Sequence, residues 1–489
     1  MSSIDEIRDT RIKKLEILKE KGINPYPAKT KKELDISQVL EQFESLEKSG
    51  EEKWIAGRIM SIRGQGAIIF LNITDGTGLF QVLLKKDSVS SEDKFDLFNE
   101  TIDIGDFIEV FGNFFVTKRG EKTLEAKDWN ILSKSLLPLP EKWHGLQDIE
   151  ERFRKRYLDI LMNNEIKEIF EKKARFWDAT RNFLKKEGFL EVETPTLEIT
   201  TGGAEARPFK THHNDFDMDV FLRISVGELW QKRLLAAGFP RVFEIGRIYR
   251  NEGTSPEHLQ EFTNMEFYAG YMDYEEGIEL TERMIKEIVK ETFGTLEFDI
   301  KGNKIDFEKK WEKISYVDTV KEMLKIDVLT ADEKEMKKKL DEVGVKYEGE
   351  NRERLTDSLW KYCRKQIVGP VWLVDVPKLV SPLSKAKQEN SELTERVQLI
   401  LVGAEITNGF SELNDPLDQS DRFDVQKKLI ESGDEEAMMA DWEFVEMLEH
   451  GMPPSFGFGF GAERFFAMLI NKPLRETQLF PLMRPKKEE

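Results

Sequence analysis

The chain reads Gly457-Phe458-Gly459-Phe460-Gly461-Ala462-Glu463-Arg464 and continues as the apolar run Phe465-Phe466-Ala467-Met468-Leu469. Glycine at every second position leaves one side of an extended backbone bare, so a flat ligand can lie close to it. An arginine then stands at the start of a predicted helix. Glycine-rich turns precede many helices, so the meaning of this pattern depends on the segments upstream.

Two upstream segments supply that context. A strand-like segment ends in Tyr249-Arg250-Asn251-Glu252-Gly253, and Gly188-Phe189-Leu190-Glu191-Val192-Glu193-Thr194-Pro195 precedes it. In this order and spacing, the three segments resemble motifs 1, 2 and 3 of the class II aminoacyl-tRNA synthetases. The resemblance implies an enzyme that activates an amino acid with ATP. Such chemistry needs positioning and cations and no covalent nucleophile, because the attacking carboxylate is already ionised.

Size and composition agree with a globular protein of two or three domains. The chain has 489 residues, of which 39% are hydrophobic and 34% charged, and this excludes a disordered or membrane-spanning class. The first residues do not resemble a signal peptide. The single cysteine, Cys363, can form no internal disulfide, and the sequence has no zinc-ligand spacing. We therefore expect a cytoplasmic location.

The formal net charge of −19 argues at first against a nucleic-acid partner. Basic residues nevertheless gather on two predicted helices, at Arg8, Arg11, Lys13, Lys14, Lys19 and Lys21, and at Arg152, Arg154, Lys155 and Arg156. Solvated helix faces explain such runs in most proteins. A role in binding phosphates requires an adjacent nucleic-acid module.

Residues 1–140 are predicted to hold a helix and a small β domain. The amphipathic helix spans 4–21, and five strands are expected at 54–62, 67–74, 79–84, 107–116 and 122–126. Five short strands favour a small barrel, of which the oligonucleotide-binding (OB) type is the usual five-stranded case. The pattern alone leaves other small β domains open. The stiff stretch Leu136-Leu137-Pro138-Leu139-Pro140 marks the boundary.

Residues 141–489 are predicted to form the second domain. A long helix is expected at 161–187, and beyond it strands and helices mix without βαβα alternation. This favours an α+β fold with an antiparallel sheet and flanking helices. The segment at about 325–370 is rich in Lys and Glu and is expected to be a helical insertion.

Further segments narrow the resemblance to the class II lysyl-tRNA synthetases, over nearly the whole chain. They are Gly22–Pro27, His144–Asp148, Gly202–Phe209, Thr211–Asn214, Asn408–Asp415, Leu479–Pro481 and Met483–Pro485. The resemblance implies activation of L-lysine, its transfer to lysine tRNA, and a homodimer built on Phe189–Pro195 and the preceding helix.

The resemblance also assigns ATP contacts. Arg250 would bridge the amino-acid carboxylate and the α-phosphate, and Arg464 would hold ATP from the other side. Glu252 would accept the adenine amino group, while Phe262 would stack on the ring. His258 would reach the terminal phosphates.

A lysine pocket must hold an ammonium group at its far end, which requires carboxylates and other acceptors. By resemblance, Glu412 and Tyr268 meet the ε-ammonium, and Glu228 and Gly203 meet the α-amino group. The implied lysine contacts are Gly203, Glu228, Arg250, Glu266, Tyr268, Asn408, Phe410 and Glu412.

Magnesium bound to ATP would be held by Glu405, a hard oxygen ligand. The family usually has an acidic residue where this chain has Gln398, which leaves the number of metal ions open. Gln398 and Glu405 would face similar surroundings only if a bend lies between them. The segment Ser225-Val226-Gly227-Glu228 is also one residue longer than the family pattern.

The barrel of this family reads the uridines of the anticodon. The matching positions are Phe70, Gln81 and Glu121. A base can stack on the aromatic ring while the polar side chains read its edge.

Two other functions are consistent with parts of the pattern. An aspartyl or asparaginyl synthetase shares the barrel and the motifs, but an anionic side chain would need a cation where Glu412 lies. A non-catalytic synthetase-like protein that binds tRNA or regulates would be consistent with Gln398, whereas Arg250, Glu252, Glu405 and Arg464 argue for an enzyme.

Overall fold

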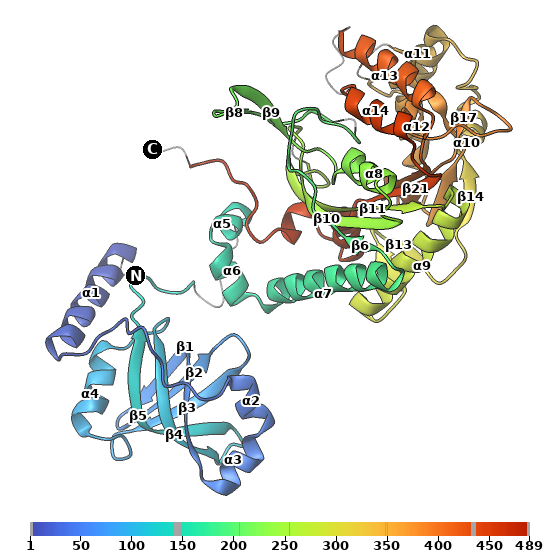
Figure 1. Cartoon of the computed structure of the whole chain (residues 1–489). Coiled ribbons are helices and arrows are strands. Elements are labelled where there is room, and N and C mark those ends of the chain that lie inside the picture. The colour runs from blue at the N-terminus through green and yellow to red at the C-terminus, as the bar shows by residue number, and fades with distance from the viewer. Residues whose placement is uncertain are drawn as a thin grey trace. The chain divides into compact units, whose positions relative to one another are not determined.

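The computed structural model describes residues 3–140, 146, 148–204, 206–253, 255–347, 349, 351–431 and 437–486. The chain forms two compact units, Met1–Met162 and Asn163–Glu489 (Figure 1). The predicted boundary after residue 140 borders residues 141–145. Those residues, together with Gln147 and Glu205 of the quoted segments, lie outside the described part, and the boundary stays a prediction.

The first unit contains a closed five-stranded barrel in the order β1-β2-β3-β5-β4, which confirms the predicted OB-type architecture. Alternation along β2 turns Ile69, Leu71 and Ile73 into the barrel and leaves Phe70 half-buried on the outside. The strands are β1 (Glu52–Gln65), β2 (Ile68–Thr74), β3 (Leu79–Lys85), β4 (Phe107–Val116) and β5 (Lys122–Ser133).

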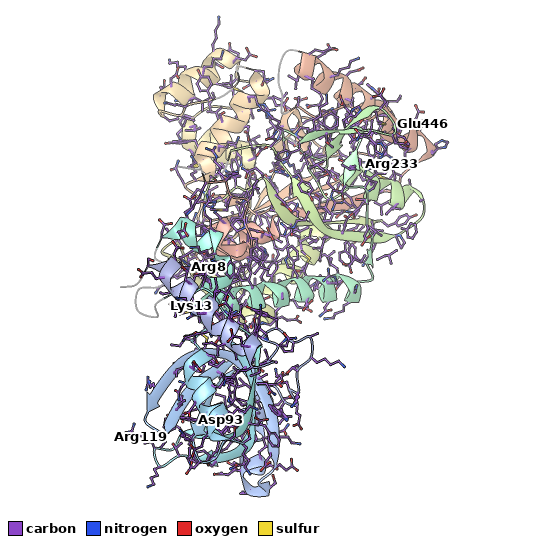
Figure 2. The ribbon with its side chains drawn as sticks, turned by 90° about the vertical axis from the view of Figure 1, so that its left-hand side faces the viewer. Arg8, Lys13, Asp93, Arg119, Arg233 and Glu446 are labelled. Carbon is purple, nitrogen blue, oxygen red and sulfur yellow. The ribbon has the colours of Figure 1, made fainter. Side chains whose placement is uncertain are left out.

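Helix α1 (Ile4–Glu20) begins at a capping box in which Ser3 and Glu6 exchange hydrogen bonds, and Gly22, with φ +73°, follows its end. Its basic residues do not share one role. Arg11 is buried and donates to the backbone oxygens of Ile104, Ser135 and Leu137. Arg8 and Lys13, labelled in Figure 2, are exposed. The other helices of this unit are α2 (Ile36–Glu41), α3 (Phe43–Ser49), α4 (Glu92–Thr101), α5 (Ile149–Arg154) and α6 (Arg156–Met162).

The second unit is built on a nine-stranded sheet in the order β14-β15-β18-β20-β21-β11-β10-β6, with β19 paired to β18. All pairings from β15 to β10 are antiparallel, as predicted, and the two parallel pairs, β14 with β15 and β10 with β6, lie at the edges. Its strands are β6 (Leu190–Glu191), β10 (Arg241–Tyr249), β11 (Glu261–Gly270), β14 (Glu312–Ser315), β15 (Val371–Val374), β18 (Arg396–Leu401), β19 (Ala404–Glu405), β20 (Thr407–Ser411) and β21 (Ser455–Phe460).

The two faces of this sheet have different chemistry because side chains alternate along each strand. Phe456, Phe458 and Phe460 of β21 enter the main core, with Met265 and Phe267 of β11. This core also contains residues of α7 (Asn164–Lys186), α9 (Tyr274–Phe293) and α15 (Ala462–Leu469). Figure 1 shows α7 and α9 on this side of the sheet and α8 (Glu228–Ala236) on the other.

The remaining helices of this unit pack in two smaller cores. Residues of α8, α13 (Pro416–Glu431) and α14 (Trp442–His450) pack in a smaller apolar cluster. The predicted insertion contains α11 (Glu333–Glu342) and α12 (Arg352–Arg364), which share a core with the preceding α10 (Tyr316–Leu324). Small sheets are formed by β7 (Leu197–Glu198), β8 (Lys210–His213) and β9 (Met218–Leu222), by β12 (Glu297–Ile300) and β13 (Asn303–Asp306), and by β16 (Val376–Pro377) and β17 (Leu393–Thr394).

Candidate active site

A cavity of about 430 Å³ opens on the α8 face of the sheet. Its walls come from β11, β18–β21, α8, α12 and α15 and from the loop that follows β10. The predicted residues that line it are Gly203, Glu228, Arg250, Glu252, His258, Phe262, Glu266, Tyr268, Gln398, Glu405, Asn408, Phe410 and Arg464. Residues that lie far apart in the sequence, such as Gly203 and Arg464, therefore meet in one pocket, as the resemblance implied.

Arg250 follows the last residue of β10. Its Nε and Nη2 lie 3.4 Å from the backbone oxygen of Ile224, and its guanidinium carbon lies 5.6 Å from the centre of the Phe262 ring. These contacts fix the plane of the guanidinium and use little of its donor capacity. Burial lowers the pKa of Arg250, yet a guanidinium keeps its charge in proteins. The side chain is therefore available to an anion in the cavity.

Arg464 and His258 flank the same region. The Nη1 of Arg464 lies 3.3 Å from the backbone oxygen of Glu405, so α15 presents this arginine at its first turn. His258 Nδ1 lies 2.7 Å from the hydroxyl of Ser255. Partial burial, and next the charge of Arg464, lower the pKa of His258. The imidazole is therefore neutral at pH 7 and can act as a hydrogen-bond donor.

Glu252 lies in the loop that follows Arg250. The backbone oxygen of Glu252 accepts a hydrogen bond of 2.9 Å from Gln260, and its own side chain is exposed. Phe262 is half-buried on β11, opposite Ile248. Loop and ring thus form one edge of the cavity, where a planar group can lie.

Gln398 and Glu405 are brought together by a tight hairpin between β18 and β19. Val402 and Gly403 both have positive φ, 45° and 74°, and Ile400 pairs with Glu405. This is the bend that the sequence required for both side chains to line one cavity.

The carboxylate of Glu405 is already partly engaged. Its Oε1 accepts from Trp360 Nε1 at 2.9 Å and pairs with Arg364 Nη1 at 2.7 Å. Burial acts to raise the pKa of Glu405, but Arg364 and Trp360 outweigh it, so the pKa lies below the usual value. The carboxylate is therefore ionised at neutral pH and can bind a cation in the cavity.

The donor set at the hairpin fits a metal ion only in part. It offers one carboxylate and the amide of Gln398, and no cluster of three His, Cys, Asp or Glu that could hold a metal occurs in the described ranges. Magnesium commonly takes one or two carboxylates and completes its shell with phosphates and water. These residues therefore fit a magnesium ion carried on phosphates better than a resident metal.

A second group of lining residues includes the buried carboxylate of Glu266. Glu266 Oε1 accepts from the backbone N–H of Val226 at 2.8 Å, and its Oε2 accepts from the Tyr268 hydroxyl at 3.1 Å. Asn408 Oδ1 accepts from Arg396 at 2.8 Å. Phe410 supplies an apolar wall. Burial, and next the charge of Glu228, raise the pKa of Glu266 to about 7.

A buried lysine joins two of the predicted carboxylates. Lys232 Nζ lies 2.7 Å from Glu228 Oε1 and 2.7 Å from Glu412 Oε2, and the side chain of Lys232 is 1% exposed. Burial opposes its charge, but the two carboxylates outweigh it and raise the pKa of Lys232. Lys232 was not predicted from the sequence, although its place four positions after Glu228 on a helix was a usable signal.

Glu412 does not lie in the cavity wall. It is fully buried on the side-chain side of Gly457, where an added Cβ would fall 2.0 Å from Glu412 Oε1, so the carboxylate fills the place that a side chain at this position would take. Burial raises the pKa of Glu412 to about 8, against the influence of Lys232. Because Gly457 lines the cavity, this carboxylate lies directly beside the cavity wall.

The barrel residues lie on the outside of the first unit. Phe70 is half-buried opposite Arg63 and Leu83, and Gln81 accepts from the Thr123 hydroxyl at 2.8 Å. Glu121 is exposed in the turn before β5, in the same turn as Arg119, which Figure 2 labels. Phe70 is not one of the core residues of the barrel, so its ring is accessible for stacking.

Comparisons with known proteins agree with this architecture. Residues 148–484 match the family described as tRNA synthetases class II (D, K and N), and residues 53–132 match the OB-fold nucleic acid binding domain. The chain is 45% identical over 491 residues to a lysine–tRNA ligase of Thermotoga maritima, covering 99% of this chain and 97% of the relative. It is 40% identical over 490 residues to a lysine–tRNA ligase of Moorella thermoacetica, covering 99% of each.

Proposed function

This chain belongs to the class II tRNA synthetases of the D, K and N group and, within it, to the lysine–tRNA ligases, and we propose that its cavity activates L-lysine with ATP for transfer to lysine tRNA. The observation that carries the proposal is one cavity that brings Arg250 and Arg464 together with the buried carboxylates of Glu228 and Glu266. Such a lining suits a substrate that carries both a carboxylate and ammonium groups.

In the first step, a lysine carboxylate oxygen attacks the α-phosphorus of ATP, and the bond to the leaving pyrophosphate breaks. Arg250 would hold both the carboxylate and the α-phosphate, since its guanidinium has donors to spare. Arg464 and neutral His258 would bind the outer phosphates. Glu252 and Phe262 would hold the adenine, through its amino group and its ring face.

Lysine would lie with its side chain along Phe410. Glu228 and the backbone at Gly203 would hold the α-ammonium group, and Glu412 with Tyr268 would hold the ε-ammonium. Glu266 and Asn408 would complete the polar wall. The buried carboxylates argue against an aspartyl or asparaginyl enzyme, because Lys232, the cation that contacts Glu228 and Glu412, is already shared by these two carboxylates.

Magnesium would enter with ATP. Glu405, with the amide oxygen of Gln398, would hold it against the phosphates, and the ion would neutralise charge on the leaving pyrophosphate. Arg364, which pairs with Glu405, would keep that carboxylate ionised and oriented.

In the second step, a ribose hydroxyl at the 3′ end of the tRNA attacks the carbonyl carbon of the adenylate, and AMP leaves. Selection of the tRNA would fall to the barrel. Phe70 would stack on an anticodon base, and Gln81 and Glu121 would read base edges.

We further propose a homodimer and a cytoplasmic location. Leu190 and Leu197, which are 49% exposed, and Ile199, which is 69% exposed, give the motif 1 region an apolar surface. Cys363 is buried and unpaired, which suits a reducing compartment. None of the helices in the described ranges is long and apolar enough to cross a membrane.

The proposal is tested by charging of lysine tRNA with labelled lysine in the presence of ATP and magnesium. We expect acid-precipitable lysine to appear on lysine tRNA and not on aspartate tRNA. A chain that binds lysine tRNA without charging it would favour the non-catalytic alternative instead.

A further inference from the structure

Lys232 occupies an unusual place in the candidate active site. Its ammonium is buried against Glu228 and Glu412, at 2.7 Å from each, and lies 5.3 Å from the ring centre of Phe410 and 5.8 Å from those of Tyr268 and Phe444. It does not line the cavity. The ammonium is thus held behind the wall by the carboxylates that a lysine substrate would need.

Each of these carboxylates uses one oxygen for Lys232 and points the other towards a glycine of the cavity wall. Glu228 Oε2 would lie 2.6 Å from a Cβ added to Gly203, and Glu412 Oε1 would lie 2.0 Å from a Cβ added to Gly457. Glu412 Oε1 is buried and accepts no hydrogen bond from the described residues. The second oxygens therefore lie against two glycines of the cavity wall, in the space that a side chain at either position would fill.

Stability does not account for this arrangement. Burying two carboxylates and an ammonium carries a large desolvation penalty, and well-packed apolar side chains often stabilise a fold equally or better. What an ion triad does provide is fixed geometry. One ammonium within 2.7 Å of both carboxylates determines how far apart their remaining oxygens can be.

We propose, on the premise that the cavity activates lysine, that Lys232 is a positioning residue that sets the length of the diamino acid accepted. It fixes Glu228 for the α-ammonium group and Glu412 for the ε-ammonium group at one separation. A diamino acid with a shorter side chain, such as ornithine, can engage one of these carboxylates but not both. Lys232 itself touches no substrate atom.

The test compares lysine and ornithine as substrates of amino-acid-dependent pyrophosphate exchange in the full chain and in Lys232→Met. Methionine nearly matches the volume of lysine and removes only the ammonium. The matched control is Arg233→Met on the same helix, because Arg233, labelled in Figure 2, pairs with Asp441 at 2.9 Å and does not line the cavity.

We expect Lys232→Met to raise the KM for lysine roughly ten- to hundredfold. This is the effect of losing one contact between a substrate ammonium group and a carboxylate that Lys232 no longer holds in place. The KM for ATP should stay within about twofold of the wild-type value. The preference for lysine over ornithine should fall by about the same factor as the KM for lysine rises. Arg233→Met should keep the wild-type preference. Where Lys232→Met does not fold, Lys232→Gln should likewise raise the KM for lysine and leave the KM for ATP nearly unchanged.

Two results would overturn this role. One is an unchanged preference for lysine over ornithine as substrate of a folded Lys232 variant. The other is an equal rise in the KM for lysine and in the KM for ATP. A wild-type chain that activates neither lysine nor ornithine would instead refute the proposed function, so the two failures are distinguishable.

Discussion

We propose that four charged side chains decide what the cavity can bind. Arg250 lines the cavity with unused donors, and Glu228, Glu412 and Lys232 form a buried triad. The resemblance to the lysyl-tRNA synthetases predicted Arg250, Glu228 and Glu412. Lys232 escaped prediction because a lysine four positions after a glutamate on a helix is far more often a surface pair, and only the fold shows that this one is buried.

Replacing Arg250 with Ala should abolish formation of the adenylate. Removal of one charge-assisted contact to the reacting groups takes away roughly 3 kcal/mol or more of transition-state stabilisation, so pyrophosphate exchange should fall at least about a hundredfold. The matched control is Arg247→Ala, an exposed arginine on the same strand. Near-normal exchange in Arg250→Ala would contradict the assigned role.

Lysine binding should improve as the pH rises from 6 to 8. Burial raises the pKa of Glu266 to about 7 and of Glu412 to about 8 in the free pocket. Pairing with substrate ammonium favours the ionised carboxylates, so the pKa values fall on binding and protons are released in this window. Calorimetry in two buffers of different ionisation enthalpy should detect this release.

The Glu412→Gln variant separates the two substrates. It should weaken the binding of lysine far more than the binding of ATP, and it should reduce the proton release. The control Glu446→Gln, at the exposed position that Figure 2 labels, should change neither lysine binding nor the proton release. Equal losses of affinity for lysine and for ATP would place Glu412 outside the lysine pocket.

At the scale of elements, strand alternation explains why the site lies where it does. The sequence pattern of β21 puts phenylalanines into the core and glycines on the cavity face, and this much could be predicted. The hairpin between β18 and β19 could not. Val402-Gly403 is a weak turn signal, because a valine rarely adopts positive φ, and tertiary pairing with β19 imposes it.

The hairpin leads to a prediction for Gln398→Glu. A carboxylate is a stronger ligand for a hard dication than an amide. The substitution should therefore lower the magnesium concentration that gives half-maximal exchange. If the magnesium curve of the variant overlays that of the wild type, Glu405 supplies all the protein charge that the ion requires.

The outer face of the barrel predicts a separation of activities. Phe70→Ala should impair charging of lysine tRNA without changing lysine-dependent exchange, because one stacked base contributes roughly 1–3 kcal/mol. Phe111→Ala is the control, since Phe111 lies half-buried on β4 and stacks on Trp54 at 5.2 Å. A parallel loss of exchange in Phe70→Ala would identify a folding residue.

At the scale of the whole molecule, the two units divide the proposed work between recognition of tRNA and chemistry. The sequence predicted both architectures, because periodicity and motifs are local signals. It could not show that Arg11 is buried against the backbone of its own unit, nor that α12 of the insertion contributes Trp360 and Arg364 to the cavity region. Both depend on tertiary packing, which no local pattern records.

The most direct test of the account is amino-acid-dependent exchange of pyrophosphate into ATP by the purified chain without tRNA. Lysine should support exchange, whereas aspartate and asparagine should not, because the carboxylates of Glu228, Glu266 and Glu412 favour a substrate with two ammonium groups over one with an anionic or amide side chain. Exchange with aspartate or asparagine in preference to lysine, or with no amino acid at all, would contradict the account.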